Sequence, residues 1–206
     1  MNNFISLQAP LQNLIEAVLS CNEKHGKWLN TLSYLENCGA RKIAACEHSS
    51  MVKEEMLKHA AEEFRHAHYL KKQLNRLGVR LVDYNLSSLL GGWESMHYLN
   101  RLDLHCVRYL KQHFALEEIK EHAYTLVTYA IELRASELYP LYQQALKAWG
   151  SSVRVTSIYL EEKEHLEEME NRIAHMPNGN VHASWLACLE HQLSSNWIEA
   201  ILKEIE

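Results

Sequence analysis

The sequence predicts an all-α protein, and three observations support this prediction. Only 7 Gly and 3 Pro occur in 206 residues, so few positions favour a break in a helix. Ala, Leu, Glu, Lys and Gln, which all have high helix propensity, are abundant. Apolar residues recur at the three- and four-residue spacing of amphipathic helices, and no stretch shows the alternation typical of a strand.

Seven helices are expected, and their bounds follow from the apolar stripes and from the turn residues between them. They are predicted at residues 5–24, 27–47, 51–77, 86–112, 115–148, 152–175 and 183–204. The first carries a clear apolar stripe made of Leu11, Leu14, Ile15, Val18 and Leu19. Gly26 is expected to separate it from the second helix. A turn at residues 47–50 follows, in which Ser50 is a candidate N-cap for the third helix.

The second half of the chain shows equally clear turn signals. The fourth helix is long enough to link the two halves of an up-down-down-up bundle, and Gly91 and Gly92 are expected to break it. Pro140 should kink or locally unwind the fifth helix. Residues 149–152 end that helix and cap the next one. Residues 176–180, which contain Pro and Gly, form the last turn.

Composition narrows the class of protein. A formal charge of −5 argues against nucleic-acid binding as the main role. The 5 cysteines form no C-x-x-C motif, so we expect reduced thiols in a cytoplasmic protein. The first residues lack the basic and apolar regions of a signal peptide, and no apolar run approaches the ~20 residues of a membrane span. We therefore expect one cytoplasmic domain over residues 1–206 that contacts neither nucleic acid nor membrane.

Two copies of a Glu-x-x-His motif lie on the third and sixth predicted helices. Glu63 and His66 are one copy, and Glu162 and His165 are the other. A spacing of three residues places each pair on one helix face, and apolar neighbours indicate that this face points inward. Because burying a carboxylate and an imidazole without partners is costly, a bound metal ion is a good reason for their presence. Two such pairs supply half of the ligands of a di-iron carboxylate site.

A di-iron site of this kind also needs one Glu on the helix before each pair. Glu36 precedes Glu63 by 27 residues and lies among small residues that leave room for a metal ion. Glu132 precedes Glu162 by 30 residues and also has small neighbours. Glu137 is the alternative to Glu132, because it lies on a more apolar face and matches its partner's distance from the turn at residue 150. Spacing favours Glu132.

Other polar residues near these motifs receive simpler interpretations. Glu94 and His97 form a third Glu-x-x-His match on the linking helix, which we interpret as a chance match. His59 lies one helical turn before Glu63 and is interpreted as a hydrogen-bonding or core histidine rather than an extra ligand. Three tyrosines near the proposed site are interpreted as packing residues, with a radical or a hydrogen-bonding partner of a ligand as the alternative for one of them: Tyr129, Tyr139 and Tyr159.

The duplicated arrangement resembles the ferritin-like superfamily, especially its rubrerythrin-like and di-iron oxidase members. The resemblance spans roughly residues 27–175 and includes the segments at 61–67 and 138–142. It implies a ferritin-like four-helix bundle with additional N-terminal, crossover and C-terminal helices. It also implies that two iron ions, with manganese as the alternative, are held by four carboxylates and two histidines: Glu36, Glu63, His66, Glu132, Glu162 and His165.

The chain departs from this family in two ways. The first spacing of 27 residues is short, and the cysteine pairs of a rubredoxin module are missing. Electron transfer within the chain, as in a self-contained rubrerythrin, is therefore not expected, and an external electron donor would be needed.

The resulting functional hypothesis is a non-haem di-iron oxidase or oxygenase that uses oxygen or peroxide. Its substrate would be a small or carrier-bound molecule, its catalytic residues are unknown, and a homodimer is compatible with the sequence. One alternative is an iron-binding or iron-detoxifying protein without an organic substrate. Another is a metal-free or haem-oxygenase-like helical bundle. For the oxidase we expect an apolar cavity at the metals, lined by Leu32, Ile43, Leu126 and Leu133 and filled by Ala130→Phe.

Overall fold

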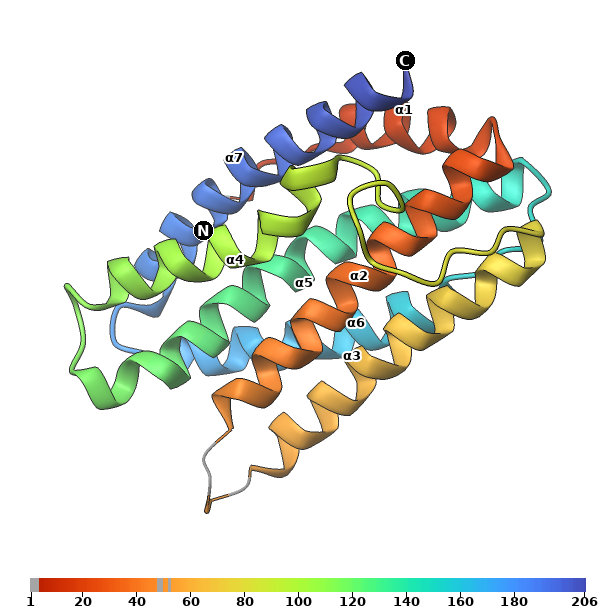
Figure 1. Ribbon diagram of the computed structural model, residues 1–206. Helices are drawn as coiled ribbons and strands as arrows, with labels where there is room; N and C mark the ends of the chain where they lie inside the picture. The colour runs from red at the N-terminus through yellow and green to blue at the C-terminus, as the bar shows by residue number, and fades with distance from the viewer. Residues whose placement is uncertain (1–3, 48–49, 52) are drawn as a thin grey trace.

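The computed structural model describes residues 4–47, 50–51 and 53–206, and all regular secondary structure in these ranges is helical (Figure 1). The elements are α1 (Gln8–Leu19), α2 (Asn22–Cys46), α3 (Glu54–Gln73), the short 3-10 helix η1 (Leu74–Leu77), α4 (Gly92–Leu110), α5 (Leu116–Ala148), α6 (Thr156–His175) and α7 (Gly179–Ile205). The predicted all-α class is confirmed. No helix within the described ranges is both long and apolar enough to cross a bilayer.

Two helix hairpins form the centre of the molecule. Helices α2 and α3 pack along each other, and so do α5 and α6 (Figure 1). Side chains of α3 and α6 reach across to each other, as the ion pair between Arg65 and Glu161 shows. The four helices therefore present side chains from four directions to a common interior.

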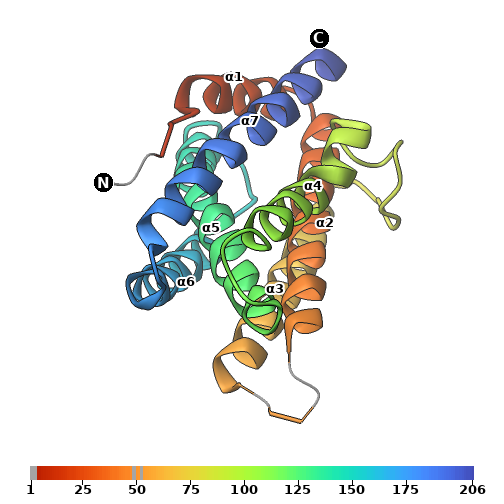
Figure 2. The ribbon, with the colours of Figure 1, turned by 90° about the vertical axis from the view of Figure 1, so that its left-hand side faces the viewer.

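The remaining helices cover one side of these hairpins. Helices α4 and α7 run side by side and both pack against α5, while α1 contacts α2, α5 and α7 (Figure 2). Helix α3 lies on the opposite side of the molecule from α7 (Figure 1). The cover formed by α4 and α7 contributes walls to a cavity next to the central polar residues.

The apolar core is divided into two clusters, one toward each end of the hairpins. On α2, Leu32 belongs to the first cluster and Ile43 to the second. On α6, Ile158 belongs to the first cluster and Met169 to the second. The Glu and His residues singled out by the sequence lie between these positions. Each hairpin thus carries a polar layer at mid-length, between two regions of close apolar packing.

Gly26 does not interrupt a helix as predicted. It is a buried residue inside α2, and the first two helices instead separate at Ser20 and Cys21. A Cβ atom at Gly26 would lie 2.6 Å from Cγ1 of Val79, which is too close for any real contact. The glycine therefore allows the segment after η1 to pack directly on α2. Sequence spacing alone does not reveal such a contact.

The glycines of the linking helix also act differently from the prediction. Gly91 has a φ of 73°, in the left-handed region, and precedes the first residue of α4, Gly92. The pair thus begins this helix rather than breaking it, because a left-handed residue suits glycine. Helix α5 passes through Pro140 as one continuous helix, so the predicted local unwinding does not occur.

The start of α3 differs from the prediction as well. Helix α3 begins at Glu54 after Lys53, so Ser50 is not its N-cap. Within the predicted turn at 47–50, His48 and Ser49 lie outside the described residues. The position of the hairpin between α2 and α3 is nevertheless the one predicted.

Candidate metal centre

Seven ionisable side chains from four helices converge in the polar layer. Six of them are buried, with residue exposures between 1% and 6%, and the seventh, on α2, is half-buried. They are Glu36 on α2, His59, Glu63 and His66 on α3, Glu132 on α5, and Glu162 and His165 on α6. All six residues predicted from the sequence are thus brought together, and His59 joins them. Their role as metal ligands remains a prediction.

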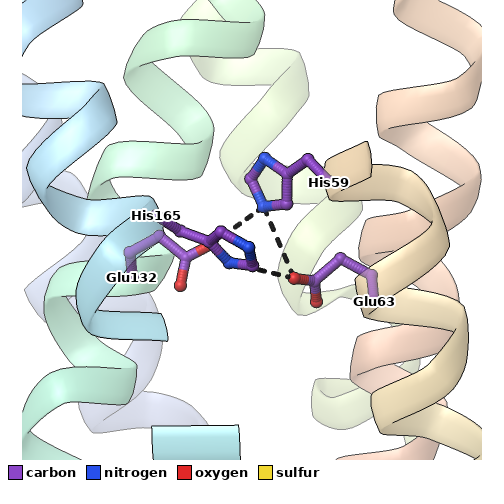
Figure 3. Close-up of side chains that lie close together, drawn as sticks. All are labelled: His59, Glu63, Glu132 and His165. Carbon is purple, nitrogen blue, oxygen red and sulfur yellow. Dashed lines mark hydrogen bonds and ion pairs between the residues drawn. The ribbon is translucent and has the colours of Figure 1, made fainter. Parts of the chain in front are cut away.

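The first group consists of His59, Glu63, Glu132 and His165 (Figure 3). One ligand atom of each residue lies within 4.8 Å of the corresponding atoms of the others. Nε2 of His59 is 3.3 Å from Oε1 of Glu132 and 3.4 Å from Oε1 of Glu63. Nδ1 of His165 is 3.5 Å from that same oxygen of Glu63. Two imidazoles and two carboxylates therefore face one point.

The second group consists of Glu36, Glu63, His66 and Glu162, whose ligand atoms satisfy the same 4.8 Å limit. Nδ1 of His66 lies 3.0 Å from Oε1 of Glu162, 3.8 Å from Oε1 of Glu63 and 4.0 Å from Oε2 of Glu36. Glu63 belongs to both groups. A carboxylate shared by two groups is suited to bridge two cations.

The outer nitrogen of each motif histidine is held by a carboxylate from the opposite hairpin. Nε2 of His66 lies 2.8 Å from Oε2 of Glu161, and Nε2 of His165 lies 2.9 Å from Oε2 of Glu62. When Nε2–H donates to these carboxylates, Nδ1 of each ring is left with a lone pair facing the interior. Metal-binding histidines are usually oriented by this arrangement.

Glu62 and Glu161 are functional candidates that the sequence reasoning missed. Each directly precedes the Glu of its Glu-x-x-His motif, so the pattern Glu-Glu-x-x-His was the available signal. Neighbouring helix residues point in different directions, so the first Glu does not share the helix face of the motif. Its partner lies across the site on the other hairpin, which no local pattern reveals.

Five buried polar atoms of the two groups have no hydrogen-bond partner among the described residues. They are Oε1 of Glu63, Nδ1 of His66, Oε2 of Glu132, Oε1 of Glu162 and Nδ1 of His165. Buried polar atoms are nearly always satisfied in folded proteins, so five in one place require an explanation. All five are acceptors when His66 and His165 are neutral rings protonated at Nε2, which is the form in which they would bind a metal ion. Cations would satisfy them, and four carboxylates balance the charge of two divalent ions.

The carboxylates destabilise one another in the absence of a cation. Burial and the neighbouring Glu162 raise the pKa of Glu63 to about 8. Burial and the adjacent Glu63 raise the pKa of Glu36, and burial and Glu162 do the same for Glu132. Burial also opposes ionisation of Glu162, but contacts with Glu132 and the two histidines lower its pKa overall. The group therefore retains protons that a metal ion would displace.

This electrostatic arrangement predicts the pH dependence of the metal-free protein. Burial tends to lower the pKa of His66, but Glu162 and the other carboxylates raise it to about 9. Glu63 and His66 thus bind protons more tightly when folded, so their stabilisation is complete below their ordinary pKa values and disappears as pH rises through 8 to 9. The lowered pKa of Glu162 makes stability depend on pH only below pH 4.5, the ordinary pKa of this side chain.

Thermal unfolding in a chelator should therefore show a melting temperature that falls between pH 5 and pH 9. Added metal should raise the melting temperature more at alkaline than at acidic pH, because its ligands must be deprotonated. In Glu63→Gln the fall should be smaller. A melting temperature that rises steadily across this range in the metal-free protein would contradict the electrostatics described above.

Of the two candidate residues on α5, the structure places only Glu132 in the polar layer. Glu137 instead accepts hydrogen bonds from Arg134 at 2.5 Å and from the backbone N–H of Leu7 at 3.1 Å. The third motif also lies elsewhere, since Glu94 pairs with Arg101 and His97 stacks on Trp93. Glu132 is thus the α5 residue that lies beside the other candidates, and its role as a metal ligand stays a prediction.

Substitution of the two α5 residues should separate a ligand from a structural carboxylate. We expect Glu132→Gln to raise the apparent Kd for metal by at least about tenfold, because a charged donor is lost from the first group. Glu137→Gln should leave metal content unchanged and weaken only the contact with Arg134. Metal analysis after dialysis measures both. Loss of metal in Glu137→Gln alone would show that the assignment on α5 is wrong.

Two tyrosines contact the layer directly, and one of them, Tyr139, is among the three singled out from the sequence. The hydroxyl of Tyr139 donates a hydrogen bond to Oε1 of Glu36. Burial raises the pKa of Tyr139 well above its ordinary value, so its hydroxyl stays protonated at neutral pH. Tyr124 lies with its hydroxyl 3.0 Å from Nδ1 of His59. His59 itself was expected outside the ligand set, although its spacing of four residues from Glu63 places both on one helix face.

A mostly apolar cavity of about 80 Å³ reaches Glu36 and Glu63. It lies between α2, α4, α5 and α7, and the residues around it are Leu32, Leu35, Glu36, Gly39, Glu63, Tyr98, Leu99, Ile131, Arg134, Ala135, Leu138, Tyr139 and Trp197. Of the predicted lining residues only Leu32 is present. Ile43, Leu126, Leu133 and Ala130 belong to the second apolar cluster, so Ala130→Phe would not fill this cavity.

Comparison of the chain with models of protein families, with curated proteins and with solved structures gave no match.

Proposed function

We propose that the chain is a ferritin-like four-helix bundle, formed by α2, α3, α5 and α6, that holds two iron ions in its polar layer. Manganese is the alternative metal. One observation carries this proposal. Two overlapping groups that share Glu63 contain five buried nitrogen and oxygen atoms that could bind metal and that have no hydrogen-bond partner among the described residues. Carboxylate and imidazole donors suit Fe²⁺ and Mn²⁺. The carboxylates that hold the outer nitrogens of His66 and His165 support the same conclusion.

We propose further that the site is a non-haem oxidase or oxygenase. When bound, a pair of ferrous ions supplies electrons and open coordination positions for reduction of oxygen or peroxide. The protein supplies the surroundings for this chemistry. Glu62 and Glu161 orient the two histidines, and the apolar walls of the cavity keep bulk water from Glu36 and Glu63. The Tyr139 hydroxyl, bonded to Glu36, places a proton at the side where the cavity meets this carboxylate.

The proposed activity is tested by loading the protein with iron under anaerobic conditions and then adding an oxidant. Protein loaded with ferrous iron and mixed with oxygen or hydrogen peroxide should oxidise its iron rapidly, as followed by absorbance in a stopped-flow instrument. His66→Ala and His165→Ala should slow this oxidation strongly, because each removes a nitrogen donor from one group. His68→Ala is the matched control, since His68 is exposed on the same helix as His66.

The outcomes separate the candidate functions. Fast oxidation in the unmodified protein and in His68→Ala, with slow oxidation in the two other variants, would support the oxidase. A loaded protein that is inert to both oxidants would instead support metal binding without oxidation. A protein that binds no metal would contradict the whole proposal.

A further inference from the structure

The cavity beside the proposed metal site has a definite size and chemical character. Its volume of about 80 Å³ exceeds the roughly 10–15 Å³ that one water molecule requires and is about half the roughly 150 Å³ of an apolar cavity that binds benzene or xenon. Most of its walls are Leu, Ile and aromatic side chains, and the carboxylates of Glu36 and Glu63 lie on one side. The half-buried wall residues Leu35, Ile131 and Ala135 lie on α2 and α5. The cavity therefore reaches the surface between these two helices.

The only cationic side chain in the cavity wall has its charge fully paired. Arg134 is 4% exposed and uses Nε and Nη2 to bind Glu190, at 3.0 and 2.8 Å. Its Nη1 binds Glu137 at 2.5 Å, and Nη2 also reaches the backbone carbonyl of Ile5. Every guanidinium nitrogen thus already donates a hydrogen bond, and the positive charge faces two carboxylates, which disfavours an anionic ligand. An anion in the cavity would also face the carboxylates of Glu36 and Glu63.

Gly39 lies in the cavity wall and is unusual for its position. It lies inside the 25-residue helix α2, where glycine costs about 1 kcal/mol relative to alanine. Its backbone is not in the left-handed region, so the conformation does not require glycine. A Cβ atom there would meet only Oε2 of Glu63, at an ordinary distance of 3.9 Å, among the residues that the structure describes. Close packing does not explain this glycine, but the open space beside Glu63 does.

We propose that this cavity is a binding site for a small uncharged molecule the size of dioxygen or hydrogen peroxide, and that Gly39 keeps it open. This inference rests on the proposed function for the identity of the natural ligand, but the cavity can be tested without metal. It implies that a bulky organic molecule does not reach Glu36 and Glu63 through this opening. The site would then distinguish between oxidants by their size.

Xenon is a suitable probe, because it is uncharged and fills small apolar cavities. Crystals of the metal-free protein under xenon pressure should show xenon between α2 and α5 beside Leu32 and Leu138. Gly39→Leu should abolish this site, because the added side chain is large enough to occupy it. Ala45→Leu, at an exposed position of the same helix, should retain it. A cavity without xenon in the unmodified protein, or with xenon retained in Gly39→Leu, would overturn the proposal.

A smaller substitution, Gly39→Ala, provides a second test in case Gly39→Leu does not fold. Gly39→Ala should raise the melting temperature by roughly 2–4 °C, because alanine favours the helix and its methyl group has room. A lowered melting temperature would mean that packing requires the glycine, and the proposal would be wrong.

The size limit can be tested in the metal-loaded protein by comparing the reaction rates of two oxidants of different size. Hydrogen peroxide takes one electron from each of two ferrous ions and two protons to give two waters. tert-Butyl hydroperoxide takes the same electrons and protons to give tert-butanol and water. We expect the second oxidant to react much more slowly, and Gly39→Leu to slow hydrogen peroxide about tenfold or more while two metal ions remain bound. Equal rates for both oxidants would contradict the size limit. A loaded protein that is inert yet binds xenon in its metal-free form would contradict the proposed function and support the cavity assignment.

Discussion

Glu63→Ala is expected to remove both metal ions from the protein, with an apparent Kd raised by more than about 100-fold. Replacement of an outer partner of a ligand typically costs 10- to 100-fold in metal affinity, and Glu63 belongs to both ligand groups. Its Oε1 lies 3.4 Å from Nε2 of His59 and 3.8 Å from Nδ1 of His66. Metal content after dialysis, measured by plasma emission spectrometry, tests this expectation directly.

Variants of the unshared residues provide the comparison. Glu36→Ala and His59→Ala each alter one group, so each should weaken one ion and leave the other bound. Glu55→Ala, at an exposed position of α3, should change nothing. Retention of both ions in Glu63→Ala would rule out a shared carboxylate. Equal losses in all three site variants would show that the two groups do not act as separate positions.

Glu190→Ala is expected to lower the free energy of unfolding by about 3–5 kcal/mol, the range for removing one partner of a buried ion pair. Glu190 is 1% exposed and accepts hydrogen bonds from Arg134 and, at 2.7 Å, from the Tyr98 hydroxyl. Its loss leaves a buried guanidinium and a buried hydroxyl without these acceptors. Denaturant unfolding at neutral pH measures the effect.

Glu199→Ala is the matched control on the same helix. Its pair with Lys203, at 2.7 Å, is solvent-exposed, and such pairs contribute little to stability. The double variant Arg134→Leu, Glu190→Leu should regain part of the lost stability, because the guanidinium that lost its Glu190 partner is removed as well, while Glu137 loses its contact with Arg134. A loss below about 1 kcal/mol in Glu190→Ala would mean that Arg134 finds another partner.

The sequence predicts the helices well because their signals are local. Apolar stripes and turn residues predict all seven helices, and α5 begins one residue from its predicted start. Gly26 was misinterpreted because its role depends on Val79, which lies 53 residues later in the chain. Propensity treats such a glycine as a break, whereas the fold uses it for a close approach.

The candidate site is predictable where ligands share one helix face and hidden where they do not. Glu63 with His66 and Glu162 with His165 are visible by spacing, and the hairpin geometry adds the carboxylates of α2 and α5. The contacts of Glu161 with His66 and of Glu62 with His165 depend on the distance between the two hairpins, which no local sequence pattern contains. The prediction of the cavity walls was wrong for the same reason, since the walls include Tyr98 and Trp197 from the covering helices α4 and α7.

We propose that the polar layer holds two metal ions. Anomalous diffraction from crystals grown with Fe²⁺ or Mn²⁺ tests it most directly, because it locates the ions and identifies the element. We predict two peaks about 3.5–4 Å apart, one among His59, Glu132 and His165 and the other among Glu36, His66 and Glu162, with Glu63 between them. A polar layer without an anomalous peak under saturating metal, with Glu63 still bonded only to protein, would contradict the claim.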